Sequence, residues 1–282
     1  MRLFLLTALT LIAFAANSVL ARAALAEGAI GPGLFTALRL AAGALMLGFL
    51  VAARRRRAGR GAGGLSGGWF PALMLLVYAA GFSFAYTGLP TGTGALILFG
   101  GVQVTMFAGA LAGGERPGVA RWAGAVLALA GLGVLFAPGA AAPAPDRAAL
   151  MLAAAVGWGV YSLRGRAAGD ALGATAGNFL LAAVPGCAIG LLAGEPAPGL
   201  VGVLLAVASG AVASGLGYAL WYTVLLRLEM SVAAVAQLTV PLIALAGGMV
   251  FLGEPATWRF AVAAALVLGG VGGAILLGRR RA

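Results

Sequence analysis

Long apolar stretches alternate with short polar segments along the whole chain. A membrane-spanning helix needs about 20 mostly apolar residues, because the hydrocarbon core of a bilayer is about 30 Å thick. The gaps between the stretches are rich in Gly, Pro or charge, and none could hold a soluble domain. The pattern predicts ten spans, at residues 3–21, 33–53, 69–88, 93–112, 119–138, 148–163, 173–193, 199–224, 231–251 and 258–278. The eighth is long enough to be tilted or kinked.

The first stretch has a second interpretation as a signal peptide. Met1-Arg2, an apolar run and then Ala21-Arg22-Ala23 match the pattern of a charged start, an apolar centre and a small-residue cleavage site. Cleavage would leave nine helices and destroy the internal repeat described below. We therefore expect this segment to be a retained helix.

Composition supports a membrane protein over a soluble one. Hydrophobic residues make up 62% of the 282 positions and charged residues 9%, whereas a soluble domain carries about 25% charge. The chain has one cysteine, Cys187, and no histidine. An intrachain disulfide or a cysteine-based metal site is therefore excluded, and we predict neither a metal nor a cofactor.

The basic residues predict the orientation. All 18 are arginines, placed between apolar runs as the positive-inside rule describes, which argues against nucleic-acid binding. A cytoplasmic N-terminus puts 14 of them on the cytoplasmic side: Arg2, Arg54, Arg55, Arg56, Arg57, Arg60, Arg116, Arg121, Arg164, Arg166, Arg227, Arg279, Arg280 and Arg281. We expect a multi-pass protein of the bacterial inner membrane with both termini cytoplasmic.

An internal repeat divides the chain into halves. Glu115 and Glu254, Gly131 and Gly270, and Gly133 and Gly272 are each separated by 139 residues. A second offset of 144 residues pairs Phe14 with Trp158, Asn17 with Tyr161 and Arg22 with Arg166, and Tyr86-Thr87 matches Tyr222-Thr223. We predict five-helix repeats at 1–138 and 148–282 joined by a linker at 139–147. Because five is odd, the halves must be inverted in the membrane, an architecture typical of transporters that work by alternating access.

These residues resemble the EamA-type proteins of the drug/metabolite transporter superfamily. The resemblance rests on Asn17 and Arg22 in the first helix, Leu38-Arg39-Leu40-Ala41-Ala42 in the second, and a Gly-Glu pair before a Gly-rich helix in each half. Pro241 precedes Glu254 by thirteen residues, but the matching position in the first half is Val102. The resemblance covers the whole chain and implies an all-α fold and transport of a small molecule, without naming the cargo.

Polar and aromatic side chains within the spans are the candidates for a substrate cavity, because polar groups are costly in lipid unless they face the bundle interior. The candidates are Phe14, Asn17, Arg39, Tyr78, Phe82, Tyr86, Gln103, Trp158, Tyr161, Tyr218, Trp221, Tyr222 and Gln237. The alternatives are aromatic packing, an interfacial belt and, for the amides, hydrogen bonds between helices.

Three charged positions lie in or next to the predicted spans. Arg39 either attracts an anionic group such as a carboxylate or snorkels to the external end of its helix. Glu115 and Glu254 precede the fifth and tenth helices, where we expect them to cap the helix dipole.

The predicted function is export of a small metabolite, such as an amino acid, by alternating access. No Asp or Glu lies within a span, which favours facilitated diffusion or exchange over proton coupling. The alternatives are a scaffold or sensor without transport, a channel-like facilitator, and a membrane enzyme, which would need clustered reactive side chains. Glycine pairs in the tenth span, Gly269-Gly270 and Gly272-Gly273, predict close helix packing within the chain or in a homodimer.

Overall fold

The computed structural model describes residues 1–58, 63–114, 116–137, 139, 142–165, 169–225, 227–228 and 236–278. Arg60, Glu115, Arg166, the arginines at 279–281 and the first residues of the ninth predicted span, 231–235, lie outside the described residues. Throughout the described ranges the regular elements are all helices. The all-α fold class is confirmed.

The helices follow the apolar stretches of the sequence. Apolar runs become helices because, in lipid, the backbone N–H and C=O groups must be satisfied within the segment. In chain order they are α1 (Arg2–Leu25), α2 (Pro32–Ala58), α3 (Trp69–Tyr86), α4 (Thr91–Ala112), α5 (Val119–Phe136), α6 (Pro145–Gly165), α7 (Ala171–Leu192), α8 (Leu200–Ala208), the π-helix η2 (Ser209–Leu216), α9 (Gly217–Leu225), α11 (Val240–Leu252) and α12 (Trp258–Gly278).

Eight helical segments of the described chain are long and apolar enough to cross a membrane, the eighth being the continuous segment Leu200–Val224. Two further apolar helices follow them, Val240–Leu252 and the stretch Trp258–Ala274 of α12. Of the ninth predicted span, 231–251, the structure describes the residues from 236 onward, and α11 within it begins at Val240. The structure is thus that of a multi-pass membrane protein.

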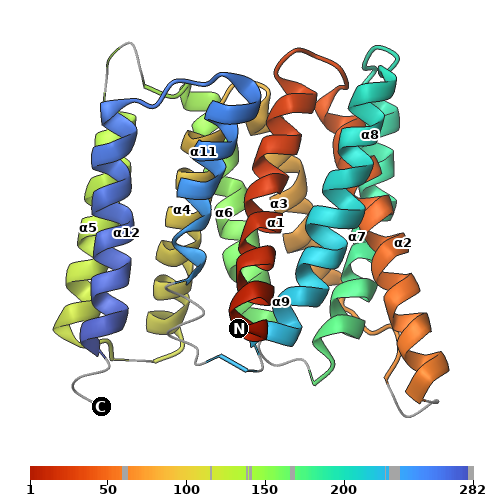
Figure 1. Ribbon diagram of the computed structural model, residues 1–282, viewed down its shortest axis with the longest axis horizontal. Helices are drawn as coiled ribbons and strands as arrows, with labels where there is room; N and C mark the ends of the chain where they lie inside the picture. The colour runs from red at the N-terminus through yellow and green to blue at the C-terminus, as the bar shows by residue number, and fades with distance from the viewer. Residues whose placement is uncertain are drawn as a thin grey trace.

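The helices stand upright beside one another (Figure 1). α5 and α12 form one flank and α2, α7 and α8 the other, with α1, α3, α4, α6, α9 and α11 between them. α1 begins and α12 ends at the same end of the molecule (Figure 1). We call this the Arg-rich end, because α2 also ends there with Arg55, Arg56 and Arg57 in its last turn.

Glycines lie at the contact between α5 and α12. A Cβ on Gly124 of α5 would lie 2.6 Å from the carbonyl oxygen of Gly270 in α12, and one on Gly131 would lie 2.8 Å from that of Ala263. Both distances are too short for any side chain, so the two backbones approach as closely as in other small-residue membrane contacts. Of the predicted glycine pairs, Gly270 therefore packs within the chain, whereas Gly269 has open space where its Cβ would be.

The eighth segment packs against α2 through a similar contact. A Cβ on Gly210 of η2 would lie 2.2 Å from the carbonyl oxygen of Arg39. The π-helical turns, which place one more residue in each turn than an α-helix does, interrupt this long segment between α8 and α9. The interruption lies where the sequence predicted a tilt or kink.

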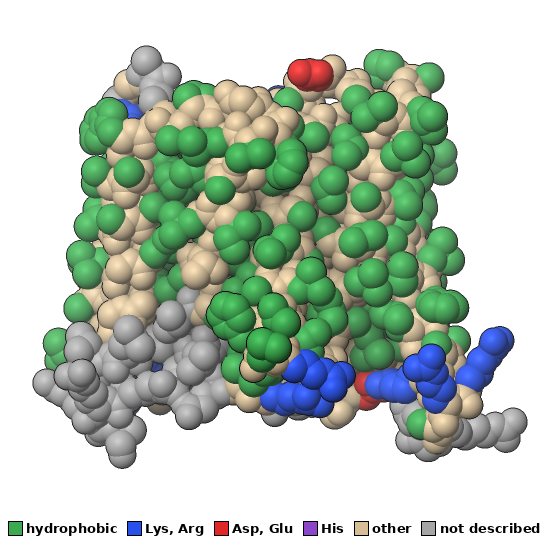
Figure 2. All heavy atoms as spheres, in the orientation of Figure 1, with side chains coloured by type: hydrophobic (Ala, Val, Ile, Leu, Met, Phe, Trp, Pro, Cys, Tyr) green, Lys and Arg blue, Asp and Glu red, His purple; other side chains and the backbone are tan. Residues whose placement is uncertain are grey.

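Apolar side chains cover the face of the molecule shown in Figure 2, and most of the basic side chains visible there lie along its lower edge, the Arg-rich end. Arg54 of α2 bonds Asp170, the residue before α7, with Nη1 2.9 Å from Oδ1. Asp170 also accepts a bond from the Gly173 amide and so caps α7. The Arg54 guanidinium, and secondarily the Gly173 amide, hold the pKa of the Asp170 carboxyl below its ordinary value.

Candidate functional site

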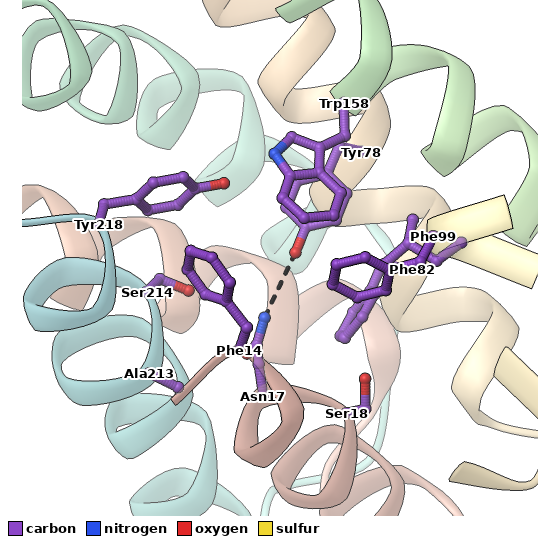
Figure 3. Close-up of a pocket in the computed structure, with 11 residues that line it drawn as sticks. Phe14, Asn17, Ser18, Tyr78, Phe82, Phe99, Trp158, Ala213, Ser214 and Tyr218 are labelled. Atoms are coloured by element: carbon purple, nitrogen blue, oxygen red, sulfur yellow. Dashed lines mark hydrogen bonds between the residues drawn. The ribbon is translucent and has the colours of Figure 1, made fainter. Parts of the chain in front are cut away.

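A small cavity lies in the middle of the bundle between helices of both sequence halves (Figure 3). Its interior volume is about 20 Å³, which is enough for about one water molecule. The cavity is lined by Phe14, Asn17 and Ser18 of α1, Tyr78 and Phe82 of α3, Leu98 and Phe99 of α4, Trp158 of α6, Ala213 and Ser214 of η2, and Tyr218 of α9. A cavity of this volume is too small for a metabolite.

Aromatic rings form most of the cavity wall. Trp158 stacks on Tyr78, with ring centroids 5.5 Å apart, and meets Phe14 edge-on at 6.3 Å. Phe14 also contacts Tyr218 and Trp221, each at 5.8 Å. Phe14 and Trp158 are the pair that the 144-residue offset relates, so the matching positions of the two halves meet at the cavity.

A chain of hydrogen bonds runs along one side of the cavity. Ser209 Oγ donates to Asn17 Oδ1, and Asn17 Nδ2 donates to Tyr78 Oη over 3.3 Å. Arg39 Nη2 also donates to Tyr78 Oη, over 2.7 Å. Because both lone pairs of the Tyr78 hydroxyl accept, its hydrogen remains available to an acceptor.

Arg39 lies within the protein and not at the helix end. It is seven residues beyond Pro32, about 10 Å along α2, and its exposed fraction is 1%. The guanidinium carbon lies 4.5 Å from the centre of the Phe82 ring and 4.9 Å from that of Tyr78. Arg39 Nη1 has no hydrogen-bond partner among the described residues. This burial contradicts the interpretation that the Arg39 side chain snorkels to the external end of its helix.

A buried polar atom without a partner among the described residues also lies on the cavity wall. Ser214 Oγ lines it, is buried, and makes no hydrogen bond within the described part of the chain. Ser209 and Ser214 were not among the candidates from the sequence. Serines in apolar helices commonly bond a carbonyl of their own helix, so their presence in a span is a weak signal of a site.

Tyr161 and Tyr222 belong to a separate cluster nearer the Arg-rich end. Tyr161 Oη donates to Thr175 Oγ1 over 3.3 Å, and Thr175 Oγ1 lies 2.8 Å from Tyr222 Oη. A second cavity, of about 200 Å³, adjoins this cluster. It is lined by Gly67, Gly68, Pro71, Tyr161, Arg164, Gly165, Ala174 and Asn178.

The remaining candidates lie outside the central cavity. Tyr86 contacts Phe82 at 4.7 Å but donates its hydroxyl to the Thr91 carbonyl over 3.2 Å. Gln103 and Gln237 are half-buried and line neither cavity. Gln103 is one turn beyond Phe99 on α4, and Gln237 precedes the first residue of α11.

Glu254 closes the end of the bundle opposite the Arg-rich end, as part of an ion pair. Its Oε1 lies 3.0 Å from Nε of Arg22, and its Oε2 accepts a bond from the Thr91 amide over 2.7 Å. Arg22 also donates to the Tyr86 carbonyl over 3.2 Å. Glu254 therefore caps the start of α4, whereas the sequence suggested that it caps the helix after it. This contact ties α1, α3 and α4 to the loop before α12.

The other acidic side chains among the described residues also lie at helix ends or in loops. Asp146 and Asp170 pair with arginines, and Glu195 accepts bonds from the Gly33 and Leu34 amides at the start of α2. Across the described ranges, no three His, Cys, Asp or Glu side chains are grouped as metal ligands would be. The arrangement of the central cavity thus fits binding by aromatic contacts, hydrogen bonds and one cation.

Comparison with known proteins shows which family and which solved structure this chain is similar to. A family model described as the EamA-like transporter family matches residues 148–276. An uncharacterized protein of Pseudomonas aeruginosa is 49% identical over 272 residues, which cover 96% of this chain and 93% of that protein. A solved crystal structure of a protein with 27% sequence identity aligns with a TM-score of 0.65, covering 96% of this chain and 99% of the other.

Proposed function

Since this chain belongs to the EamA-like transporter family, and is therefore a membrane transporter of the drug/metabolite type, we propose that it moves a small metabolite across the bacterial inner membrane by alternating access. The observation that carries the proposal is the central cavity, which residues of both halves line and whose interior volume is about 20 Å³. A channel would need a continuous polar pore, whereas this cavity is small and lined mostly by aromatic side chains. A small central cavity suits a carrier that opens to one side at a time.

The helix contacts support an inverted repeat. The 139-residue offset exchanges Gly124 with Ala263 and Gly131 with Gly270. Gly124 lies against Gly270, and Gly131 lies against Ala263, so exchanging the halves converts one contact into the other. The same exchange relates the packing of α1 on the eighth segment and α11 to the packing of α6 on α3 and α4. A two-fold axis between the halves predicts such pairs, and rocking about it alternates access.

The orientation we propose places the Arg-rich end in the cytoplasm, following the positive-inside rule. Single cysteines in a chain whose native Cys187 is replaced by serine test it. A membrane-impermeant maleimide added to intact cells is expected to label Glu27→Cys, in the exposed loop between α1 and α2. It is expected to label Arg57→Cys only after the cells are permeabilised, and the reverse pattern would overturn this orientation.

Export of a metabolite is the direction we propose, and solute profiling tests it. Cells that overproduce the protein are compared with cells that contain equal amounts of Trp158→Ala, which removes the ring that contacts Phe14, Tyr78 and Phe99. The expected result is a small metabolite that accumulates in the medium only with the unaltered protein. Identical profiles of cells and medium at verified membrane levels would instead favour a scaffold or sensor.

A further inference from the structure

The central cavity adjoins a buried positive charge that no carboxylate among the described residues balances. Arg39 is 1% exposed, and a guanidinium keeps its proton in proteins, so the charge cannot be removed by titration. Its ion-pair partners would have to be Asp or Glu, and the described residues give it none. A buried cation without a counter-ion is costly, and in membrane proteins such a residue marks a substrate or ion site by default.

Protein contacts satisfy this cation only in part. Two aromatic faces and the Tyr78 hydroxyl surround it, and cation–π contact offsets some of the lost hydration. Nη1 nevertheless lacks a partner within the described residues. Two hydrogen-bond donors around the guanidinium therefore remain without an acceptor in the described part of the chain: Arg39 Nη1 and the hydroxyl hydrogen of Tyr78. An acceptor that carries negative charge suits both donors.

The residues that contact the Arg39 guanidinium also line the cavity. Tyr78 and Phe82, the residues that contact the guanidinium, both line the cavity (Figure 3). Trp158, Phe14 and Tyr218 continue the lining as an apolar wall. A ligand that extends from the donors into the cavity would thus have an anionic end and an apolar or aromatic body.

The single positive charge of Arg39 indicates how many negative charges a bound ligand carries. Arg39 contacts Tyr78 and Phe82 of the cavity lining and supplies one positive charge there. A phosphate dianion would leave net negative charge in an apolar surrounding, which is unfavourable. No Asp or Glu lines the cavity to bind an ammonium group. A monocarboxylate without an amine is the ligand that balances the charge.

Resting on the proposed carrier function, we propose that the substrate is a small monocarboxylate with an apolar or aromatic body, and that Arg39 and Tyr78 bind its carboxylate. The observed cavity is too small for such a molecule, so binding accompanies its opening. The neutral amide of the same acid has the same shape and lacks the charge, and is expected to bind about tenfold more weakly or worse.

Matched acid–amide pairs test the proposal on the purified full chain in detergent. The probes are cyclohexanecarboxylate, hexanoate and 3-phenylpropanoate, each with its amide, together with phenylalanine and inorganic phosphate. A ligand that binds the folded protein raises its unfolding temperature. We expect at least one acid to do so in a dose-dependent way, with its amide, phenylalanine and phosphate giving a smaller rise or none.

Variants assign the preference to residues. Arg39→Gln is expected to abolish the difference between acid and amide, Arg39→Lys to retain part of it, and Tyr78→Phe, which keeps the ring, to reduce it. Arg147→Gln is the matched control, because it removes the same charge from a partly exposed pair at the start of α6. It should leave the preference intact. Tyr78→Phe keeps the test valid where Arg39→Gln fails to fold.

The proposal is overturned by equal binding of acid and amide, by a preference for phenylalanine or phosphate, by an unchanged preference in Arg39→Gln, or by no response to any of the acids. These outcomes are distinct from failure of the carrier proposal. Export of a neutral solute that persists in Arg39→Gln would refute the carboxylate and keep the carrier. Selective binding of an acid by a protein that changes no solute profile would keep the carboxylate site and refute the carrier.

Discussion

The ion pair between Arg22 and Glu254 gives a prediction about opening of the cavity. It joins α1 to the loop before α12 at the end that we propose to be extracytoplasmic, and the two side chains are 21% and 11% exposed. Glu254→Gln removes the charge while its amide oxygen can still accept from the Thr91 amide. Opening on this side requires these helices to separate, so the substitution destabilises the closed state specifically.

The magnitude follows from the contacts that are weakened. Hydrogen bonds to charged groups contribute about 1.5–3 kcal/mol, and partial exposure together with retention of the Thr91 contact argues for the lower part of that range. A change of about 2 kcal/mol shifts the ratio of open to closed protein about thirtyfold. The shift requires that the pair be absent from the open state, as alternating access implies.

Labelling of a cavity cysteine measures this ratio. Ser18 lines the cavity, is 1% exposed, and lies one turn before Arg22 on α1. In the Cys187→Ser background, Ser18→Cys should react slowly with an impermeant thiol reagent added from outside. Glu254→Gln should accelerate the reaction about thirtyfold, provided that opening and closing are fast relative to labelling.

A double-mutant cycle supplies the controls. Arg22→Gln should accelerate labelling as Glu254→Gln does, and the double variant should add little to either, because both remove one interaction. Arg54→Gln breaks an ion pair at the Arg-rich end and should not accelerate labelling from outside. An unchanged rate in Glu254→Gln, or fully additive effects, would refute the gating role of this pair.

Three further substitutions test the packing, the pH response and the helix caps. Gly210→Ala places a methyl group 2.2 Å from the Arg39 carbonyl oxygen and should cost about 1–3 kcal/mol, measured as a lower unfolding temperature; Gly133→Ala, with open space at its Cβ, is the control and should not lower it. The Arg54 guanidinium lowers the pKa of Asp170, so the stability this carboxylate contributes is present above the ordinary aspartate pKa of about 3.9 and is lost as the pH falls through the lower folded-state value. Urea unfolding should therefore show a constant difference between the unaltered protein and Asp170→Asn at neutral pH and a shrinking one below about pH 4, and a difference that grows on acidification would contradict this. Glu195→Ala leaves two amides at the start of α2 without their acceptor and should lower stability by about 1–2 kcal/mol, while an unchanged unfolding temperature would show that other acceptors replace it.

Much of the candidate site could be predicted from the sequence, because aromatic and polar side chains in lipid-spanning helices tend to face the interior. Phe14, Asn17, Tyr78, Trp158 and Tyr218 meet at one cavity. The prediction did not separate these residues from the second tyrosine cluster or from Gln103 and Gln237. Helical spacing says which residues share a face, but not which helix that face meets or how deep along it the cavity lies.

The sequence by itself determined the membrane class, the approximate spans and the clustering of arginines at one end, because lipid forces long apolar segments into helices and makes loop charge asymmetric. Only the tertiary structure decided where the charges act. It placed Arg39 inside the bundle beside Tyr78, joined Glu254 to Arg22 and to the start of α4, and packed Gly210 against the Arg39 backbone. These contacts join residues about 39 to 232 positions apart. They depend on how helices cross and on which backbones can approach, and a local pattern along one chain does not record either.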